Sequence, residues 1–163
     1  MNESQNFVNL IFVLNQRLFN NALVGITEEQ STERISENNN TVNWIAAHTV
    51  WARYMMLMLL GKPTENPYKD LFENFKPYDE KIKYPTLEEI KNQWALVSEL
   101  LKEALANVTE EQLASDSPLK SPIGEYSIAG TMAFLAQHES YDIGQLGFLK
   151  KYFTKEAMSY KEF

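Results

Sequence analysis

The sequence predicts an all-α protein, an up-and-down four-helix bundle with a long crossover between its second and third helices. Four segments repeat apolar side chains with the helical period of about 3.6 residues. No segment shows the sustained alternation of apolar and β-branched residues that is typical of strands. The 163 residues, of which 44% are hydrophobic, are enough for one domain with a core. We therefore expect residues 1–163 to form a single domain.

Apolar stripes define the first two helices, and a stop signal ends the second. The first helix is expected over residues 5–23 and the second over residues 42–60. Gly61 and Pro63 follow the second helix, and these residue types commonly end helices. The expected buried stripes are Phe7, Leu10, Ile11, Leu14 and Leu18 in the first helix and Ile45, Thr49, Ala52, Met56 and Leu59 in the second.

The third and fourth helices each have an apolar stripe, and the third also has a start signal. The third begins at Thr86, because Thr86 and Glu89 can satisfy each other's backbone donors in a capping box. The fourth is expected over residues 127–152. The stripes are Leu87, Ile90, Trp94, Val97, Leu101, Ala104 and Val108 in the third helix and Ile128, Met132, Leu135, Leu146, Leu149 and Phe153 in the fourth. The spacing of the third stripe is that of a bundle seam.

The crossover is the 25-residue segment 61–85, GKPTENPYKDLFENFKPYDEKIKYP. Connections of this length are usually functional or partly helical. Its many aromatic residues predict that it packs onto the bundle.

Composition and charge exclude several classes of function. The chain contains no cysteine, which excludes disulfides, cysteine-type zinc sites and a cysteine nucleophile. Its net charge is -7 and it has no cluster of basic residues, so we expect no binding to nucleic acid. No apolar run is long enough to cross a bilayer, and the N-terminus lacks the features of a signal peptide. These features favour a cytoplasmic protein that does not bind membranes.

The two histidines of the chain lie on helices expected to face each other. His138 and Asp142, in the stretch HESYDIGQ, are one helical turn apart, and His48 lies near the edge of the second helix's stripe. Asp142 falls inside the apolar stripe, where an unpaired carboxylate is costly. A divalent cation shared by His48, His138 and Asp142 would relieve that cost. Two imidazoles and one carboxylate suit Zn²⁺, Ni²⁺, Mn²⁺ or Fe²⁺.

Other interpretations of these residues need no metal. A histidine near an apolar face can be a hydrogen-bonded core residue. Asp142 can instead belong to a side-chain network with Tyr141, Gln145 or Arg53. The stretch also approximates HExxH, with Glu139 as a general base, but aspartate replaces the second histidine and no third ligand follows.

Four blocks of sequence, in order, resemble the DinB-like superfamily of four-helix proteins with metal-ligand histidines. They are NTVNWIAAHTVWARYMMLMLLG at 40–61, NPYKDLF at 66–72, residues 84–113 and SIAGTMAFLAQHESYDIGQLGFLKKYF at 127–153. The resemblance implies that His48 and His138 are the first two metal ligands. It places Asp142 where the family has a third histidine, and Gly144 and Gln145 match a Gly-Gln pair of the family.

The resemblance also implies a function and an assembly. The family includes transferases and isomerases that use low-molecular-weight thiols, and its members are frequently dimers. We therefore expect a metal-dependent homodimer that acts on a small-molecule substrate, by thiol transfer or hydrolysis. The alternative is a metal-free module that binds a small ligand or dimerises without catalysis. Aspartate at position 142 has a shorter side chain than histidine, and its negative charge lowers the Lewis acidity of a bound metal.

Overall fold

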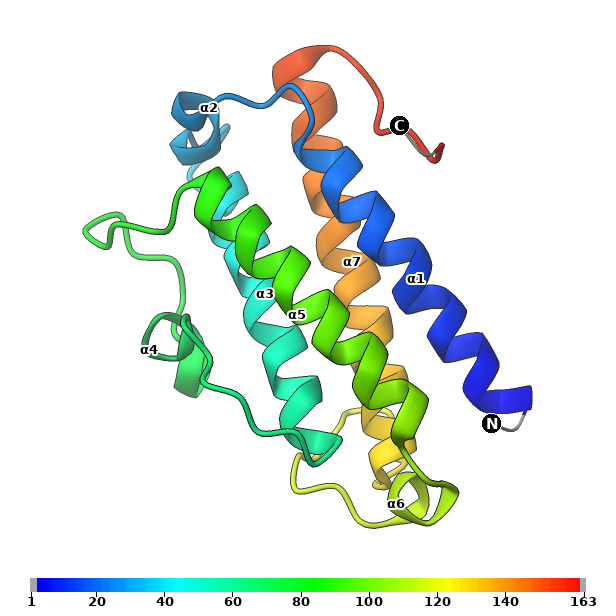
Figure 1. The fold of residues 1–163 in the computed structure, drawn as a ribbon. Helices are drawn as coiled ribbons and strands as arrows, with labels where there is room; N and C mark the ends of the chain where they lie inside the picture. Colours follow the sequence, from blue (N-terminus) through cyan, green and yellow to red (C-terminus); the bar gives the residue numbers. More distant parts are fainter. Residues whose placement is uncertain (1–2, 162–163) are drawn as a thin grey trace.

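Four long helices make up most of the computed structural model, which describes residues 3–161 and their side chains from residue 7 onward (Figure 1). The only β pairing in the described part is an isolated bridge between Asp116 and Ser127, so the predicted all-α class is confirmed. None of the described helices is long and apolar enough to cross a membrane. The long helices are α1 (Glu3–Leu23), α3 (Val42–Leu59), α5 (Leu87–Asn107) and α7 (Ile128–Thr154).

The four helices form one bundle, in which α7 packs against α1 and α3, and α3 also packs against α5. Figure 1 shows that α1 and α7 run in one direction and α3 and α5 in the other. Helices α3 and α5 run the same way because the crossover carries the chain back along the bundle before α5 begins. The predicted four-helix bundle with a long crossover between its second and third helices is therefore confirmed. Its helix directions run up-down-down-up, because the long crossover leaves α3 and α5 parallel instead of alternating.

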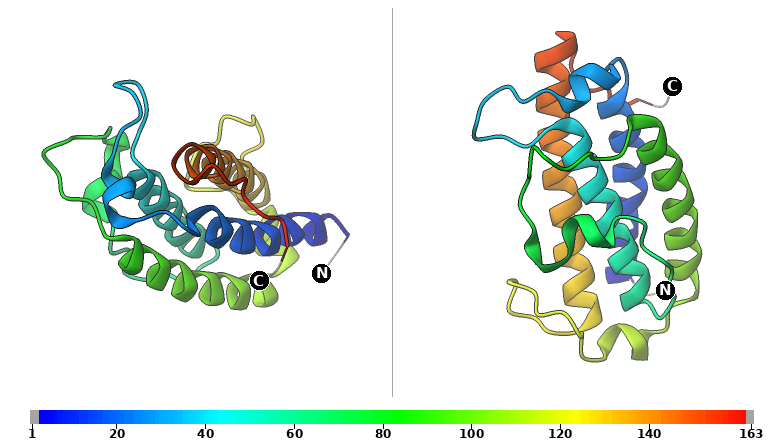
Figure 2. Two further views of the ribbon diagram at one scale, coloured as in Figure 1. Left: turned by 90° about the horizontal axis from the view of Figure 1, so that it is seen from above. Right: turned by 90° about the vertical axis from the view of Figure 1, so that its left-hand side faces the viewer.

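The crossover packs onto the bundle, as its aromatic composition predicted. It contains α4 (Lys69–Phe72) and the 3₁₀ helix η1 (Glu73–Phe75), and α4 contacts α3. Figure 2 shows this segment lying across the outside of α3. The side chain of Phe72 is fully buried there. Two further short helices, α2 (Glu28–Thr32) and α6 (Glu110–Ala114), lie at opposite ends of the bundle.

Side-chain caps fix where the long helices begin. Thr86 Oγ1 accepts a bond from Glu89 N, and Glu89 Oε2 accepts one from Thr86 N at 2.8 Å, which confirms the predicted capping box. The carboxylate of Glu28 on α2 accepts a further bond from Leu87 N at 2.9 Å. The side-chain oxygens of Thr41 and Ser127 accept bonds from Trp44 N and Gly130 N, and so cap α3 and α7.

The predicted stripe of the first helix is wrong at its N-terminal end. Phe7, Leu10 and Ile11 are exposed, by 69%, 56% and 39%. The inward face of α1 instead includes two asparagines, which apolar periodicity cannot identify as buried. Both are buried because they find partners: Asn15 Nδ2 donates to Ser140 Oγ on α7, and Asn21 Nδ2 donates to carbonyls of the C-terminal segment. The buried face comprises Phe12, Asn15, Leu18, Phe19, Asn21, Ala22 and Leu23.

Candidate metal centre

The packing of α3 against α7 brings the three predicted residues together. His48 comes from the middle of α3, and His138 and Asp142 come from successive turns of α7. One potential ligand atom from each residue lies within 4.8 Å of the other two. The two imidazoles are partly exposed, whereas the carboxylate is buried. The cluster therefore has a buried oxygen donor and two nitrogen donors nearer the surface.

Asp142 is the centre of the hydrogen-bond network in this cluster. Its Oδ2 lies 3.0 Å from His48 Nδ1 and 3.3 Å from Thr49 Oγ1, and its Oδ1 accepts a bond from Gln145 Nε2 at 3.4 Å. Thr49 also lies 2.8 Å from the carbonyl of Ile45, and its single proton can serve only one acceptor at a time. Gln145 is thus a partner of Asp142, as one interpretation of the sequence predicted.

His138 is the least satisfied member of the cluster. Its Nδ1 is buried and has no hydrogen-bond partner, and it lies 3.9 Å from Asp142 Oδ2. A buried polar nitrogen without a partner is costly. Burial lowers the pKa of His138 from its ordinary 6.5, the nearby His48 lowers it further, and the carboxylates of Asp142 and Glu139 oppose the shift. The imidazole is therefore neutral at pH 7, which is the form that binds metal ions.

Aromatic rings surround the imidazole of His48. Trp44 and Trp51, one turn before and after it on α3, stack with the ring at centroid distances of 5.0 and 5.5 Å. Phe72 of the crossover meets the same ring edge-on at 5.3 Å. These contacts restrict rotation of the imidazole and keep water from its faces. The two tryptophans are partly buried, and their contact with His48 gives them a place at the site.

The three side chains fit a divalent ion in donor type and in spacing. Metal bonds to imidazole nitrogen and carboxylate oxygen are about 2.0–2.2 Å, so two ligands of one ion stand at most about 4.4 Å apart. The three donors, all within 4.8 Å, need to close by only a few tenths of an ångström. The Nδ1 of His138, which has no hydrogen-bond partner, lies 3.9 Å from Oδ2 of the buried Asp142 carboxylate. That distance is already within the limit for two ligands of one ion. Two nitrogen donors and one oxygen donor suit Zn²⁺, Ni²⁺, Mn²⁺ or Fe²⁺.

Glu139 and Arg53 form a separate buried pair that the sequence did not reveal. Arg53 donates from Nε and Nη2 to the two carboxylate oxygens of Glu139 at 2.6 and 2.9 Å. Its Nη1 donates to Ser98 on α5 and its Nη2 to the carbonyl of Phe12 on α1, and its guanidinium lies 3.6 Å from the ring centroid of Trp94. Glu139 therefore points into the bundle core and is not free to act as a general base.

The Arg53–Glu139 pair also explains why Arg53 is not a partner of Asp142. Arg53 was one candidate for a network with that carboxylate, but its donors are committed to Glu139, Ser98 and Phe12. Tyr141, another candidate, is 63% exposed and makes no bond to Asp142. Of the three expected partners, Gln145 alone is found.

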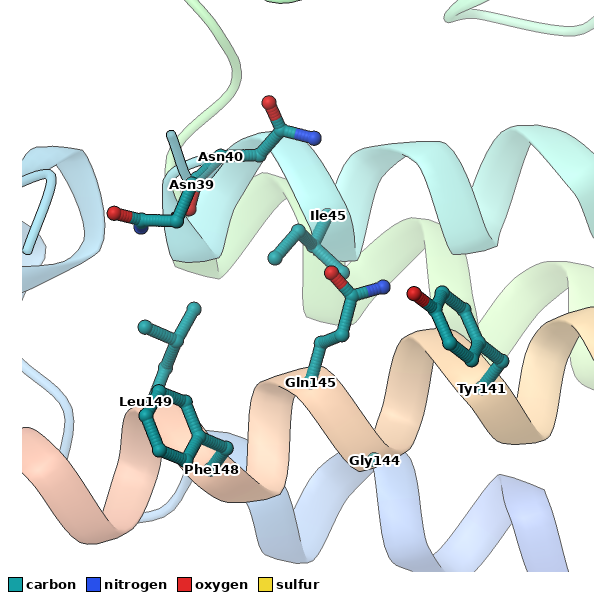
Figure 3. Close-up of a pocket in the computed structure, with 8 residues that line it drawn as sticks. All are labelled: Asn39, Asn40, Ile45, Tyr141, Gly144, Gln145, Phe148 and Leu149. Carbon is teal, nitrogen blue, oxygen red and sulfur yellow. The ribbon is translucent and has the colours of Figure 1, made fainter. Parts of the chain in front are cut away.

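A groove between α3 and α7 adjoins the cluster and has a volume of about 480 Å³ (Figure 3). This volume lies within the range of about 300–1,000 Å³ typical of small-molecule sites. Asn39 and Asn40, just before α3, line part of it. Gln145 reaches from α7 towards Ile45 on α3, with Tyr141 beside it (Figure 3). The remaining lining comes from α7: Gly144, Phe148 and Leu149.

The aromatic contacts of His48 have a weak signal in the sequence, and the Arg53–Glu139 pair has none. Trp44 and Trp51 lie four residues before and three residues after His48, which places all three side chains on one face of a helix. Phe72 could not be assigned to the site, because no pattern fixes which turn of α3 the crossover contacts.

Comparisons with known proteins agree with this architecture. The sequence model of the DinB superfamily matches residues 11–146. The crystal structure of a conserved protein from Enterococcus faecalis matches with a TM-score of 0.70 and 16% identity, over 96% of this chain and 99% of that one. At this level of identity the likeness concerns the fold alone. No match was found among curated proteins.

Proposed function

The chain belongs to the DinB superfamily, and from that premise we propose that it is a metal-dependent enzyme acting on a small molecule. Its metal is a divalent ion, Zn²⁺, Ni²⁺, Mn²⁺ or Fe²⁺, held by His48, His138 and Asp142. The observation that carries the proposal is the buried Nδ1 of His138, which has no partner and faces the carboxylate of Asp142 at 3.9 Å. A shared cation would satisfy both groups.

The reaction we propose is thiol transfer or hydrolysis. When bound, the metal would supply a Lewis acid that favours the deprotonated form of a water or thiol. The chain's own residues prepare the site for it. Trp44, Trp51 and Phe72 hold the His48 ring in place, and burial keeps His138 neutral. The carboxylate of Asp142 places one negative charge against the ion, where the family has a neutral imidazole.

A second candidate function is favoured by one specific contact. The bond of 3.0 Å between His48 Nδ1 and Asp142 Oδ2 is complete without an ion. A metal-free module would use this bond to fix α3 against α7 and would bind a small ligand in the adjacent groove without catalysis. In both cases we propose a homodimer, because Phe7, Leu10 and Val13 of α1 expose apolar side chains that a second copy could cover.

The test of the metal is elemental analysis of protein purified without a histidine tag. We expect close to one divalent ion per chain, and loss of that ion in His48→Ala and in Asp142→Ala. The matched control is Glu103→Ala, which removes an exposed carboxylate from α5, a helix that contributes no residue to the cluster. Wild-type protein that holds no metal after incubation with each of the four ions would refute the enzyme and leave the metal-free module.

A further inference from the structure

The groove beside the cluster is uncharged. Among the described residues that line it, none carries a formal charge. Its walls are mainly apolar, from Ile45, Phe148 and Leu149, and its polar groups are amides and the Tyr141 hydroxyl. An anionic group placed there would lose water without gaining a cationic partner, and the Asp142 carboxylate nearby would repel it.

A glycine keeps the groove open. Gly144 lies on α7 between Tyr141 and Phe148, which are one turn away on either side. A Cβ added at Gly144 would meet no atom within 4 Å, so the space above it is open. The two flanking aromatic side chains are 63% and 64% exposed. Tyr141 and Phe148 are therefore the two sides of an open space above Gly144.

One side chain joins the groove to the metal centre. Gln145 lines the groove, and its Nε2 donates to Asp142 Oδ1. On α3, Ile45 of the groove lies one turn from His48 of the cluster. The groove and the cluster are therefore consecutive stretches of the same α3–α7 interface. A molecule lying in the groove would have one end beside the cluster.

We propose that this groove binds the uncharged, largely apolar part of the substrate and directs its reactive end towards His48, His138 and Asp142. This rests on the proposed function. The apolar part lies against Ile45 and Leu149, over Gly144. The groove thereby selects neutral molecules over carboxylates, sulfonates and phosphates of the same shape. A thiol whose body is anionic would have to approach the cluster from outside the groove.

The experiment compares two fluorescent probes that share an aromatic body and differ in charge. N-phenyl-1-naphthylamine is neutral, and 1-anilinonaphthalene-8-sulfonate carries one sulfonate. We expect saturable binding of one neutral probe per chain, and binding of the sulfonate weaker by about tenfold or more, because its charge finds no partner. Gly144→Leu fills this open space and should weaken binding of the neutral probe by about tenfold or more.

Matched glycine variants control for the helix itself. Gly144→Ala and Gly147→Ala both raise the helix propensity of α7, but position 147 lies outside the groove, where a Cβ would meet Met158 at 3.5 Å. We expect Gly147→Ala to bind the neutral probe as wild type does. Circular dichroism of Gly144→Leu checks that the variant folds, and Gly144→Ala, with a smaller intrusion, should show a smaller loss of affinity.

The outcome is independent of the metal because the titrations are done with a chelator present. Binding of the neutral probe that Gly144→Leu leaves unchanged would overturn the groove, since the probe would then occupy another apolar surface. Equal affinity for the two probes would overturn the selection of neutral molecules. Failure of either kind leaves the metal content untouched, and a protein without metal can still pass this test.

Discussion

The buried pair of Arg53 and Glu139 gives the sharpest prediction about stability. Arg53 is 1% exposed and Glu139 fully buried, and the guanidinium bonds groups on the other three long helices. Glu139→Gln keeps the shape of the side chain but removes the counter-charge. It also turns an amide N–H₂ towards an Arg53 donor that now has no acceptor. Removing one partner of a buried pair costs about 3–5 kcal/mol.

We expect Glu139→Gln to fall near the lower end of that range, about 3 kcal/mol, because the amide oxygen still accepts one bond and Ser98 and Phe12 keep theirs. The assay is urea unfolding of metal-free protein, with an unchanged m-value as the sign that both end states are the same. The control is the double variant Arg53→Met with Glu139→Leu, which removes both charges and should recover most of the loss. A loss below about 1 kcal/mol, as for an exposed pair, would refute the reasoning.

Two further predictions concern the residues around the metal centre. Gln145→Leu removes the bond to Asp142 Oδ1 and should weaken zinc affinity by about 10–100-fold in a chelator-competition titration, whereas an unchanged affinity would show that this bond does not orient the carboxylate. Burial lowers the pKa of folded His138 below the 6.5 of the unfolded chain, so the unfolded state binds more protons below neutral pH. The metal-free protein should therefore lose stability as the pH falls from about 6.5 through the folded pKa. The variant His138→Gln should lose less over the same range. Equal dependence of unfolding free energy on pH in the two proteins would contradict this prediction.

The helices could be predicted from the sequence because their signals are local. Apolar spacing and the Thr86–Glu89 capping box define α5 to within a residue at each end. His138 and Asp142 could be placed together because they lie one turn apart on a single helix. Adding His48 to them needed only the assumption that α3 and α7 pack face to face, which the bundle provides.

The remaining features depend on contacts between segments far apart in the chain. Arg53 and Glu139 are separated by 86 positions, and no sequence pattern near either residue indicates that they pair. Phe7 and Leu10 were expected to be buried but are exposed. Apolar spacing shows that a helix has an apolar face, but it does not show whether another helix covers that face. Asn15 is a polar residue that is nevertheless buried. Its burial could not be predicted, because its amide gains its partner Ser140 only after α1 and α7 have packed.

The central claim is that one ion is shared by two imidazoles and a carboxylate. X-ray absorption at the zinc K-edge, on protein loaded with one equivalent of zinc, tests it most directly. We predict a first shell of nitrogen and oxygen at about 2.0–2.2 Å, with the outer scattering of two imidazole rings. A first shell of oxygen alone, without imidazole scattering, would contradict the account.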